Sequence, residues 1–253
     1  MNNTRFLSAM FLALLGLHLV FNGAQSGWAQ NPSGWGEIWK QRMTIGQAQL
    51  DDAFKLAESG KVDQALAAID RVIAADPGNW RSHFLKSAVL VLARRGEEAL
   101  KQIDTSINLA RKSNVSPGLL AELYASKARS CIEYGRSGEA KKSLEQSARL
   151  QPNDPSTLND LAWLLATSPD NRIRDGRRAV VLARRACELS GWKDAFSIDT
   201  LAAAFASAGN FSDAVKYQEL AISRLDSGDQ KAQAGGMQQR LRQYASGRAF
   251  TSI

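Results

Sequence analysis

The sequence predicts an all-α fold: a right-handed solenoid of about five helical hairpins that ends in a C-terminal capping helix. The main observation is an alanine that recurs at intervals of 34, 41, 39 and 35 residues, together with the residues around it. A period of about 34 residues is typical of helix–turn–helix arrays. The composition agrees, because 44% of the residues are hydrophobic, 23% are charged and only 6 are prolines. The recurring alanines are Ala65, Ala99, Ala140, Ala179 and Ala214.

Each recurring residue type has a physical role in such a hairpin. A glycine five residues before the alanine ends the first helix, because glycine adopts a left-handed backbone at little cost. The alanine lies early in the second helix, where two helices approach too closely for a larger side chain. A proline twelve residues after it ends the second helix, which proline cannot continue. The glycines are Gly60, Gly135 and Gly209, and the prolines are Pro77 and Pro152.

The same pattern predicts where the helices lie. First helices are expected near 44–59, 79–94, 116–134, 154–167 and 194–208. Second helices are expected near 62–75, 97–112, 137–150, 174–189 and 211–226. A final helix from about Gln230 to Tyr244 is expected to cover the last hydrophobic face, because a repeat array needs a polar cap.

These residues resemble the tetratricopeptide repeat over about Thr44 to Asp226. The segment 161–222, which begins LAWLLATSPDN and ends SDAVKYQELAI, resembles the variant of this repeat that is common in exported or multi-domain bacterial proteins. The resemblance implies a protein-binding array whose first helices line a concave groove. Some family members hold a partner's terminal carboxylate with a lysine and an asparagine in the first repeat. That clamp is absent here, where Leu50 and Phe54 stand at the corresponding places.

Departures from the pattern are expected to alter local geometry and to leave the fold unchanged. In the second unit Gly96 lies only three residues before Ala99, which predicts a displaced turn. Extra residues fall in the connection ARKSNVSPG before the third unit and in the turn SPDNRIRDG of the fourth. Asp226 stands where the fifth unit would have its proline.

The N-terminal residues predict an exported protein, in the periplasm or secreted by a bacterium. Arg5 precedes an apolar run from Phe6 to Phe21, and small residues follow, which is the arrangement of a secretory signal peptide. We expect cleavage after Ala29. An uncleaved anchor is the alternative, although the run is shorter than the roughly 20 residues of a membrane span.

The remaining chain divides into three regions. Residues 30–43 form an N-terminal segment whose Trp35 and Trp39 cap the array or lie in its groove. Residues 44–226 hold the five repeats, and residues 227–253 hold the capping helix and tail.

The concave groove is the predicted partner-binding site. Aromatic anchors at the centre of a groove bury much area at little entropic cost. An apolar segment of a partner protein, such as an amphipathic helix, would fit this surface. The alternative interpretation is that several of these side chains only pack against neighbouring hairpins and bind no partner. The groove positions are Phe54, Phe84, Val91, Arg129, Ile132, Asn159, Trp163, Phe196 and Asp199.

A second feature is a basic cluster in the fourth unit. Its guanidinium groups match phosphate and carboxylate groups. No aromatic residues interleave with it to stack bases, so we expect mainly a solvated convex face and little nucleic-acid binding. The cluster comprises Arg174, Arg177, Arg178, Arg184 and Arg185, with Arg172 nearby.

Nothing in the sequence predicts catalysis, a metal or a cofactor. Of the two histidines, His18 lies in the expected signal peptide, and His83 alone cannot build a histidine-based zinc site. No phosphate-binding glycine loop or nucleophile elbow occurs. Cys131 and Cys187 are expected to be small buried residues rather than a disulfide.

The leading hypothesis is therefore an exported scaffold or adaptor that binds a protein or peptide in its groove. One alternative is a structural envelope protein that self-associates through the Trp35 and Trp39 segment or the last helix. The other is a binder of anionic polymers through the arginine cluster. No membrane span is expected in the mature chain.

Overall fold

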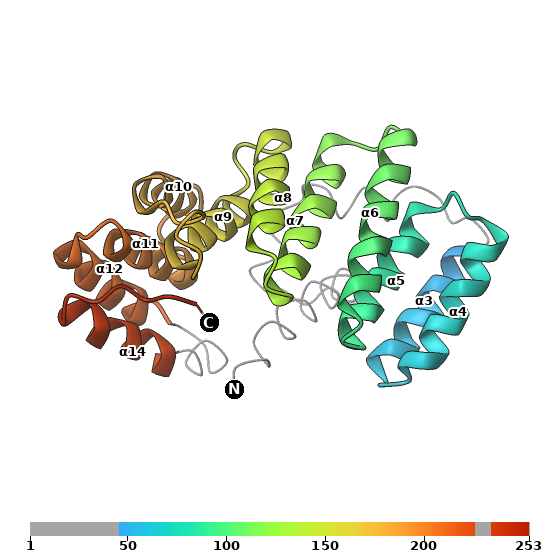
Figure 1. The fold of residues 1–253 in the computed structure, drawn as a ribbon, viewed down its shortest axis with the longest axis horizontal. Helices are drawn as coiled ribbons and strands as arrows, with labels where there is room; N and C mark the ends of the chain where they lie inside the picture. Colours follow the sequence, from blue (N-terminus) through green and yellow to red (C-terminus); the bar gives the residue numbers. More distant parts are fainter. Residues whose placement is uncertain (1–45, 226–233, 253) are drawn as a thin grey trace. The chain divides into compact units, whose positions relative to one another are not determined.

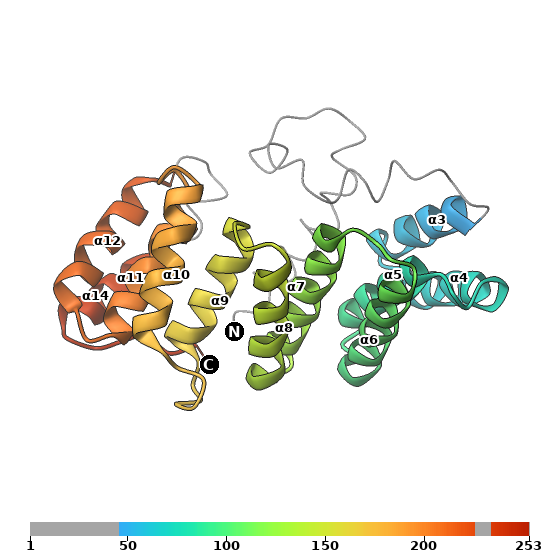
Figure 2. The same ribbon diagram turned by 90° about the horizontal axis from the view of Figure 1, so that it is seen from above.

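The computed structural model describes residues 46–225 and 234–252, and every helix or strand in these ranges is an α-helix. The helices form two compact units, which divide between Gly135 and Arg136 (Figures 1 and 2). The expected signal peptide, the Trp35 and Trp39 segment and Asp226 lie outside the described residues.

The first unit is a stack of antiparallel hairpins. Helices α3 and α4 pack together, as do α5 and α6, and α4–α5 and α6–α7 contacts join successive hairpins. The first helices α3 and α5 also contact each other, as expected in a solenoid. The helices are α3 (Gly46–Glu58), α4 (Val62–Ala75), α5 (Trp80–Leu92), α6 (Gly96–Lys112) and α7 (Pro117–Glu133).

The second unit continues the same pattern and ends in the expected capping helix. Helices α9 and α10 pack together, as do α11 and α12, and α9 also contacts α11. The last helix, α14, covers α12 and touches α11 (Figure 1). The helices are α8 (Ser137–Leu150), α9 (Pro155–Thr167), α10 (Gly176–Leu189), α11 (Ala195–Ser207), α12 (Phe211–Ser223) and α14 (Ala234–Ala245). The prediction of an α-solenoid is thus confirmed within each unit.

The packing confirms the role predicted for the recurring alanine. All five are completely buried, at 0% exposure. The small residues twelve positions earlier in the first helices are buried as well, and Ala53, Ala128 and Ala202 are also at 0%. A side chain larger than alanine would not fit where these helices meet.

The turn of the second hairpin corrects one prediction. Gly60, Gly135 and Gly209 adopt positive φ angles of 77°, 71° and 82°, as expected. In the second hairpin Arg94 lies at the position of these glycines, five residues before the recurring alanine, and has a φ angle of 60°. The turn is therefore not displaced. The hydrogen bond from Arg95 N–H to the Leu90 carbonyl, at 2.9 Å, has the same spacing as those from Lys61 to Leu56 and from Asn210 to Phe205.

Gly96 instead serves helix packing. It is the first residue of α6, and a Cβ there would lie 2.6 Å from the ring of Tyr134, which follows α7. Gly176, the first residue of α10, holds the same register in the fourth hairpin, where a Cβ would lie 2.6 Å from the backbone of Ser207 and Ala208. Both glycines therefore permit a close approach between helices.

Side-chain caps explain why several helices begin where they do. Asn79, Ser116, Asp154 and Asp194 each precede a first helix and accept a hydrogen bond from a backbone N–H of its first turn. This satisfies donors that an α-helix leaves unpaired at its N-terminus. The long turn of the fourth hairpin ends the same way, because Asp175 accepts from the N–H of Arg178.

Candidate functional site

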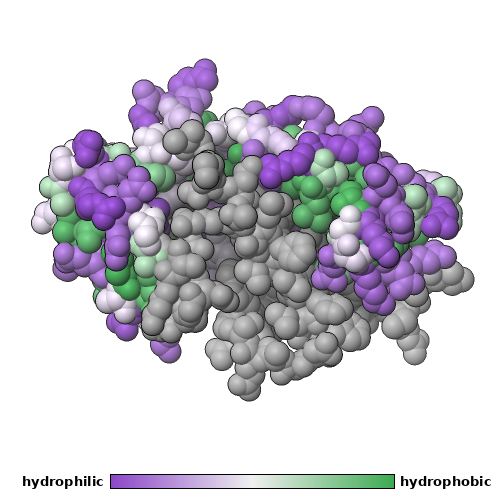
Figure 3. Space-filling view, turned by 90° about the horizontal axis from the view of Figure 1, so that it is seen from below, coloured by the Kyte–Doolittle hydropathy of each residue, from purple (hydrophilic) through white to green (hydrophobic). Residues whose placement is uncertain are grey.

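The inner positions of the first unit carry two phenylalanines that are only partly buried. Phe54 on α3 packs against the cluster around Leu50 and Leu90. Phe84 on α5 packs against a second cluster around Trp80 and Ile103. Hydrophobic residues form patches among hydrophilic ones on the described part of one face (Figure 3). Both rings are therefore only partly enclosed by these clusters.

Val91 does not belong to this surface, and its prediction as a groove residue is corrected. Its side chain is 1% exposed and lies within the cluster formed by α3 to α6. Counting along α5 from the anchor alanine placed Val91 on the inner stripe, but the hairpin packs tightly enough there to enclose it. Arg129 and Ile132 on α7 are half-buried.

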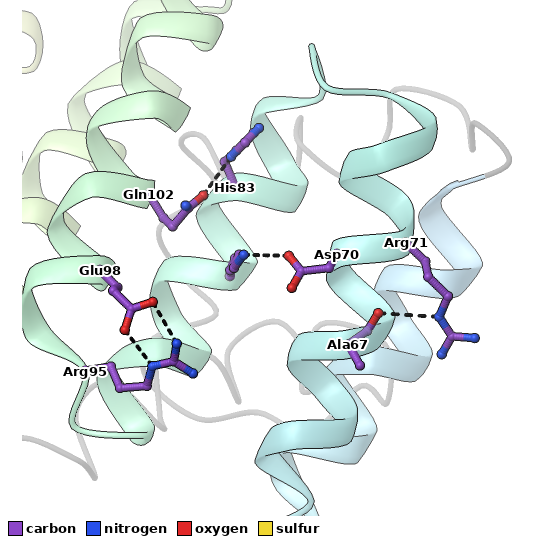
Figure 4. Close-up of polar contacts among 8 residues, drawn as sticks. Ala67, Asp70, Arg71, His83, Arg95, Glu98 and Gln102 are labelled. Carbon is purple, nitrogen blue, oxygen red and sulfur yellow. Dashed lines mark hydrogen bonds and ion pairs between the residues drawn. The ribbon is translucent and has the colours of Figure 1, made fainter.

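His83 is a packing residue, as the sequence suggested. It is 9% exposed, and its ring nitrogens lie 2.8 Å from Gln102 Oε1 and 3.3 Å from the Pro77 carbonyl oxygen (Figure 4). One turn further along α5, Lys86 pairs with Asp70 of α4. These contacts tie three helices of the first unit together and leave the imidazole no room for a substrate.

In the second unit Asp199 forms the centre of a buried polar network. Arg240 of α14 donates to both carboxylate oxygens of Asp199 on α11, at 2.9 Å and 2.6 Å. Gln218 of α12 donates to the same carboxylate at 2.7 Å. All three residues are at most 8% exposed. Asp199 was predicted to face a partner, and that prediction is corrected, since the chain's own last helix neutralises it.

Trp163 on α9 is covered by the chain's own C-terminal residues. Its ring centroid lies 5.9 Å from that of Phe250, and the Arg240 guanidinium lies 5.4 Å from the Trp163 ring and 5.5 Å from the Phe250 ring. Beyond Phe250, the N–H of Ser252 donates to the Thr167 carbonyl at 2.8 Å. The inner surface of the second unit thus already holds a short stretch of polypeptide.

Two further groove positions differ in their surroundings. Phe196, in the first turn of α11, is 38% exposed, which is high for so large an apolar side chain. Asn159 lies on α9 one helical turn before Trp163, and its Oδ1 is buried without a hydrogen-bond partner among the described residues. A buried amide oxygen without a donor is energetically costly.

The basic cluster makes many contacts within its own unit. Arg178 pairs with Glu145 of α8 at 2.7 Å, and Arg185 contacts Glu188 and Asn153. Arg174 donates to the Ser168 carbonyl at 3.2 Å. Arg177 and Arg184 are exposed on α10. Much of the cluster therefore stabilises helix packing and loops, which leaves fewer guanidinium groups for an anionic polymer.

The sequence pattern did not predict that aromatic rings lie beside this cluster. Tyr217 of α12 stacks on Phe205, with ring centroids 5.3 Å apart, and on Trp192, with ring centroids 6.0 Å apart. The Arg184 guanidinium lies 5.8 Å from the Phe205 ring. Aromatic residues do adjoin the arginines, contrary to what spacing along α10 suggested, because α11 and α12 bring them there. Tyr217 thus already stacks on two rings of its own unit.

Neither cysteine forms a disulfide, and both are completely buried, as expected. Burial raises the pKa of the Cys187 thiol to about 12, which disfavours the reactive thiolate. Among the described residues no helix is long and apolar enough to span a membrane. The same residues contain no group of three or more His, Cys, Asp or Glu side chains suited to a metal ion.

The hairpin stack, the buried alanines and the glycine turns define a helical-repeat protein. Residues 55–112 match the family model of the tetratricopeptide repeat. This segment therefore contains tetratricopeptide-repeat sequence, and the remaining hairpins share the helical-repeat fold. The match falls in the first unit, and the closer resemblance of segment 161–222 to a bacterial variant stays a prediction. No curated protein matches the chain.

Solved structures share the fold at low sequence identity. A crystal structure of MamA protein is 16% identical, with a TM-score of 0.57, and the alignment covers 74% of this chain and 93% of that one. MamA 41-end from Desulfovibrio magneticus RS-1 is 11% identical with a TM-score of 0.59, covering 72% and 97%. YrrB, described as a TPR protein with an unusual peptide-binding site, is 14% identical with a TM-score of 0.57, covering 84% and 100%. At these identities the likeness establishes the α-solenoid fold.

Proposed function

We propose that this chain is an exported, non-catalytic scaffold or adaptor that binds a protein or peptide on the inner surface formed by its first helices. One observation carries the proposal. The inner face of α9 already holds extended polypeptide through the Trp163 ring and the Thr167 carbonyl oxygen. A surface that binds one extended segment by a ring contact and a main-chain hydrogen bond has the chemistry to bind another.

The fold supports the same conclusion in general terms. A helical-repeat array presents an extended surface whose rigidity comes from its stacked hairpins. Aromatic side chains on such a surface make strong anchors, and Phe54, Phe84 and Phe196 are all incompletely buried. Peptide binding is stated for YrrB, and for this chain it is part of the proposal.

Site-specific photocrosslinking tests which surface binds the partner. A benzoylphenylalanine is placed at Phe196 on the first helix α11 in one variant and at Val181 on the second helix α10 in another. These are matched positions, because both are large exposed hydrophobic residues, at 38% and 68%. We expect a discrete crosslinked protein from an envelope fraction at position 196 and none at position 181.

A loss-of-binding experiment completes the test. The double variant Phe54→Ala/Phe196→Ala should recover at least tenfold less of the crosslinked partner, whereas Val181→Ala should recover a normal amount. Circular dichroism shows whether both variants remain helical. Equal recovery by the two folded variants would contradict binding on the inner surface.

Export forms a separate part of the proposal and has its own test. Intact-mass analysis of the protein from its native envelope should show a chain that begins at Gln30, after removal of the first 29 residues. A mature chain that still begins at Met1 would contradict cleavage after Ala29. Sedimentation of the same material distinguishes a scaffold from the self-associating alternative.

A further inference from the structure

The C-terminal residues contact the second unit in the manner of a bound peptide. After α14, Gly247 reverses the chain with φ 70°. Phe250 and Ser252 then contact α9 and are half-buried, whereas the intervening Thr251 and the preceding Ala249 are exposed. Alternate residues facing a surface are characteristic of an extended segment lying along it.

The spacing of these contacts matches the helix beneath them. Asn159, Trp163 and Thr167 are four residues apart and form one stripe along α9. Four helical residues rise about 6 Å, and two extended residues span about 6.6 Å. Phe250 therefore meets Trp163 while Ser252 meets Thr167, and the tail runs in the same direction as α9.

The surface under the tail is built without it. The guanidinium plane of Arg240 is held by its two hydrogen bonds to Asp199, which also accepts from Gln218. Helix α14 itself is anchored in the core by Met237 and Tyr244, at 0% and 1% exposure. Residues 248–252 contact α9 through the Phe250 ring and through Ser252, whose N–H and hydroxyl both form hydrogen bonds with Thr167. None of these is among the hydrogen bonds that hold Arg240 against Asp199, so Arg240 can stay in place when the tail leaves.

We propose that the α9 stripe and Arg240 form a binding site for an extended peptide with an aromatic residue followed two positions later by a small polar residue, and that residues 248–252 are its displaceable resident. This rests on the proposed protein-binding function and names the partner's chemistry. The aromatic ring takes the place of Phe250 between Trp163 and Arg240. The later backbone N–H donates to the Thr167 carbonyl oxygen.

A foreign peptide can extend further along α9 than the resident tail does. The tail has already turned away toward Gly247 two residues before Phe250, because it is joined to α14. A separate peptide has no such connection and continues along the stripe. Asn159, one helical turn before Trp163, marks the direction in which the stripe continues.

The test uses the full-length chain and a fluorescein-labelled peptide with the sequence of residues 247–252, GRAFTS. A tethered tail competes at an effective concentration of about millimolar. Phe250→Ala frees the site, so its fluorescence-anisotropy affinity for the probe should be about tenfold tighter than that of the wild type. The matched control is Thr251→Ala, which changes an exposed neighbour and should behave as the wild type.

Two further arms make the result decisive. Adding Trp163→Leu to Phe250→Ala should weaken probe binding at least tenfold, and a probe with alanine in place of phenylalanine should bind equally poorly. Probe binding that is no tighter to Phe250→Ala than to the wild type overturns the inference, as does unfolding of the second unit by Phe250→Ala alone. A wild-type dimer abolished by Phe250→Ala also overturns it, because the tail then belongs to a second copy. Crosslinking at Phe196 with no probe binding leaves the proposed function standing and removes only this inference.

Discussion

The second unit contains a buried ion pair between helices, whereas two ion pairs that join helices of the first unit lie at the surface. In the first unit, Lys86–Asp70 and Lys127–Asp104 join neighbouring helices at the surface, with carboxylate side chains 52% and 50% exposed. In the second unit, Arg240 and Asp199 have side chains only 9% and 7% exposed. Exposed pairs contribute little to stability, whereas a buried charge is strongly unfavourable once its partner is removed.

This difference shows how the array is closed at its C-terminal end. Apolar clusters are the main source of stability in the first unit, and its surface ion pairs contribute little. The second unit encloses a carboxylate, and the guanidinium of α14 supplies a positive charge that forms two hydrogen bonds to it. An apolar cap could slide along the last hairpin, whereas the fork of two hydrogen bonds specifies the position of the capping helix.

The largest effect should come from removing the buried cation. Arg240→Met leaves Asp199 without its partner, and breaking a buried ion pair costs about 3–5 kcal/mol. We expect this loss in the free energy of unfolding of the second unit, measured by urea denaturation followed by circular dichroism. The double variant Arg240→Met/Asp199→Leu should recover much of the loss, because it removes both charges. A loss below about 1 kcal/mol for the single variant would contradict a buried pair.

The next largest effect is expected at two glycines that each lie three residues before the recurring alanine of their hairpin. Gly176→Ala pushes a methyl group against the backbone of Ser207 and Ala208, and overpacking of this kind costs about 1–3 kcal/mol. Gly96→Ala meets the ring of Tyr134, a side chain that can move aside, so it should cost less. Thermal melts of both variants measure the difference. A greater loss for Gly96→Ala would show that the Tyr134 ring is as rigid as backbone.

A smaller effect is expected at the turns of the first unit. Arg94 has φ 60°, and a left-handed backbone costs a non-glycine residue about 1–2 kcal/mol. Because the Arg94 side chain makes contacts of its own, Arg94→Ala is the reference. Arg94→Gly should be more stable than Arg94→Ala by about 1 kcal/mol, and Gly60→Ala should lose about the same amount. Equal melting temperatures for Arg94→Ala and Arg94→Gly would refute the strain at this turn.

The smallest effect should be at the exposed ion pair. Lys86→Met removes the partner of Asp70, whose carboxylate is half exposed and stays hydrated. The loss should lie between about 0 and 1 kcal/mol, and high salt should reduce it further. The same urea denaturation used for Arg240→Met gives the comparison directly. A loss as large as that of Arg240→Met would remove the distinction between the two units.

The fold was predictable because its determinants are local and repeated. The recurring alanines, glycines and prolines each set a helix contact or a helix end within a few residues. The helix ranges inferred from them agree with the structure to within a few residues at most ends. The turn of the second hairpin was predicted wrongly, because Arg94 adopts a backbone that sequence preferences assign to glycine. The hydrogen bonds of the hairpin outweigh that preference.

The candidate site was predictable only in part. Trp163 and Phe196 do lie at positions open to a partner or to the tail, whereas Val91 and Asp199 are enclosed. Helical spacing tells which residues share a face, but it does not tell what else packs on that face. Residues 240 and 250 lie far from Trp163 in the sequence, and no local pattern links them to it.

The amino-acid sequence by itself determined the helical hairpin, its repetition and its small-residue contacts, because these arise from interactions between residues close in the chain. Only the tertiary structure decided that Asp199 is neutralised by Arg240 and that Phe250 covers Trp163. Those contacts join segments 41 or more residues apart, and they form only after the stacked hairpins have created a surface to receive them.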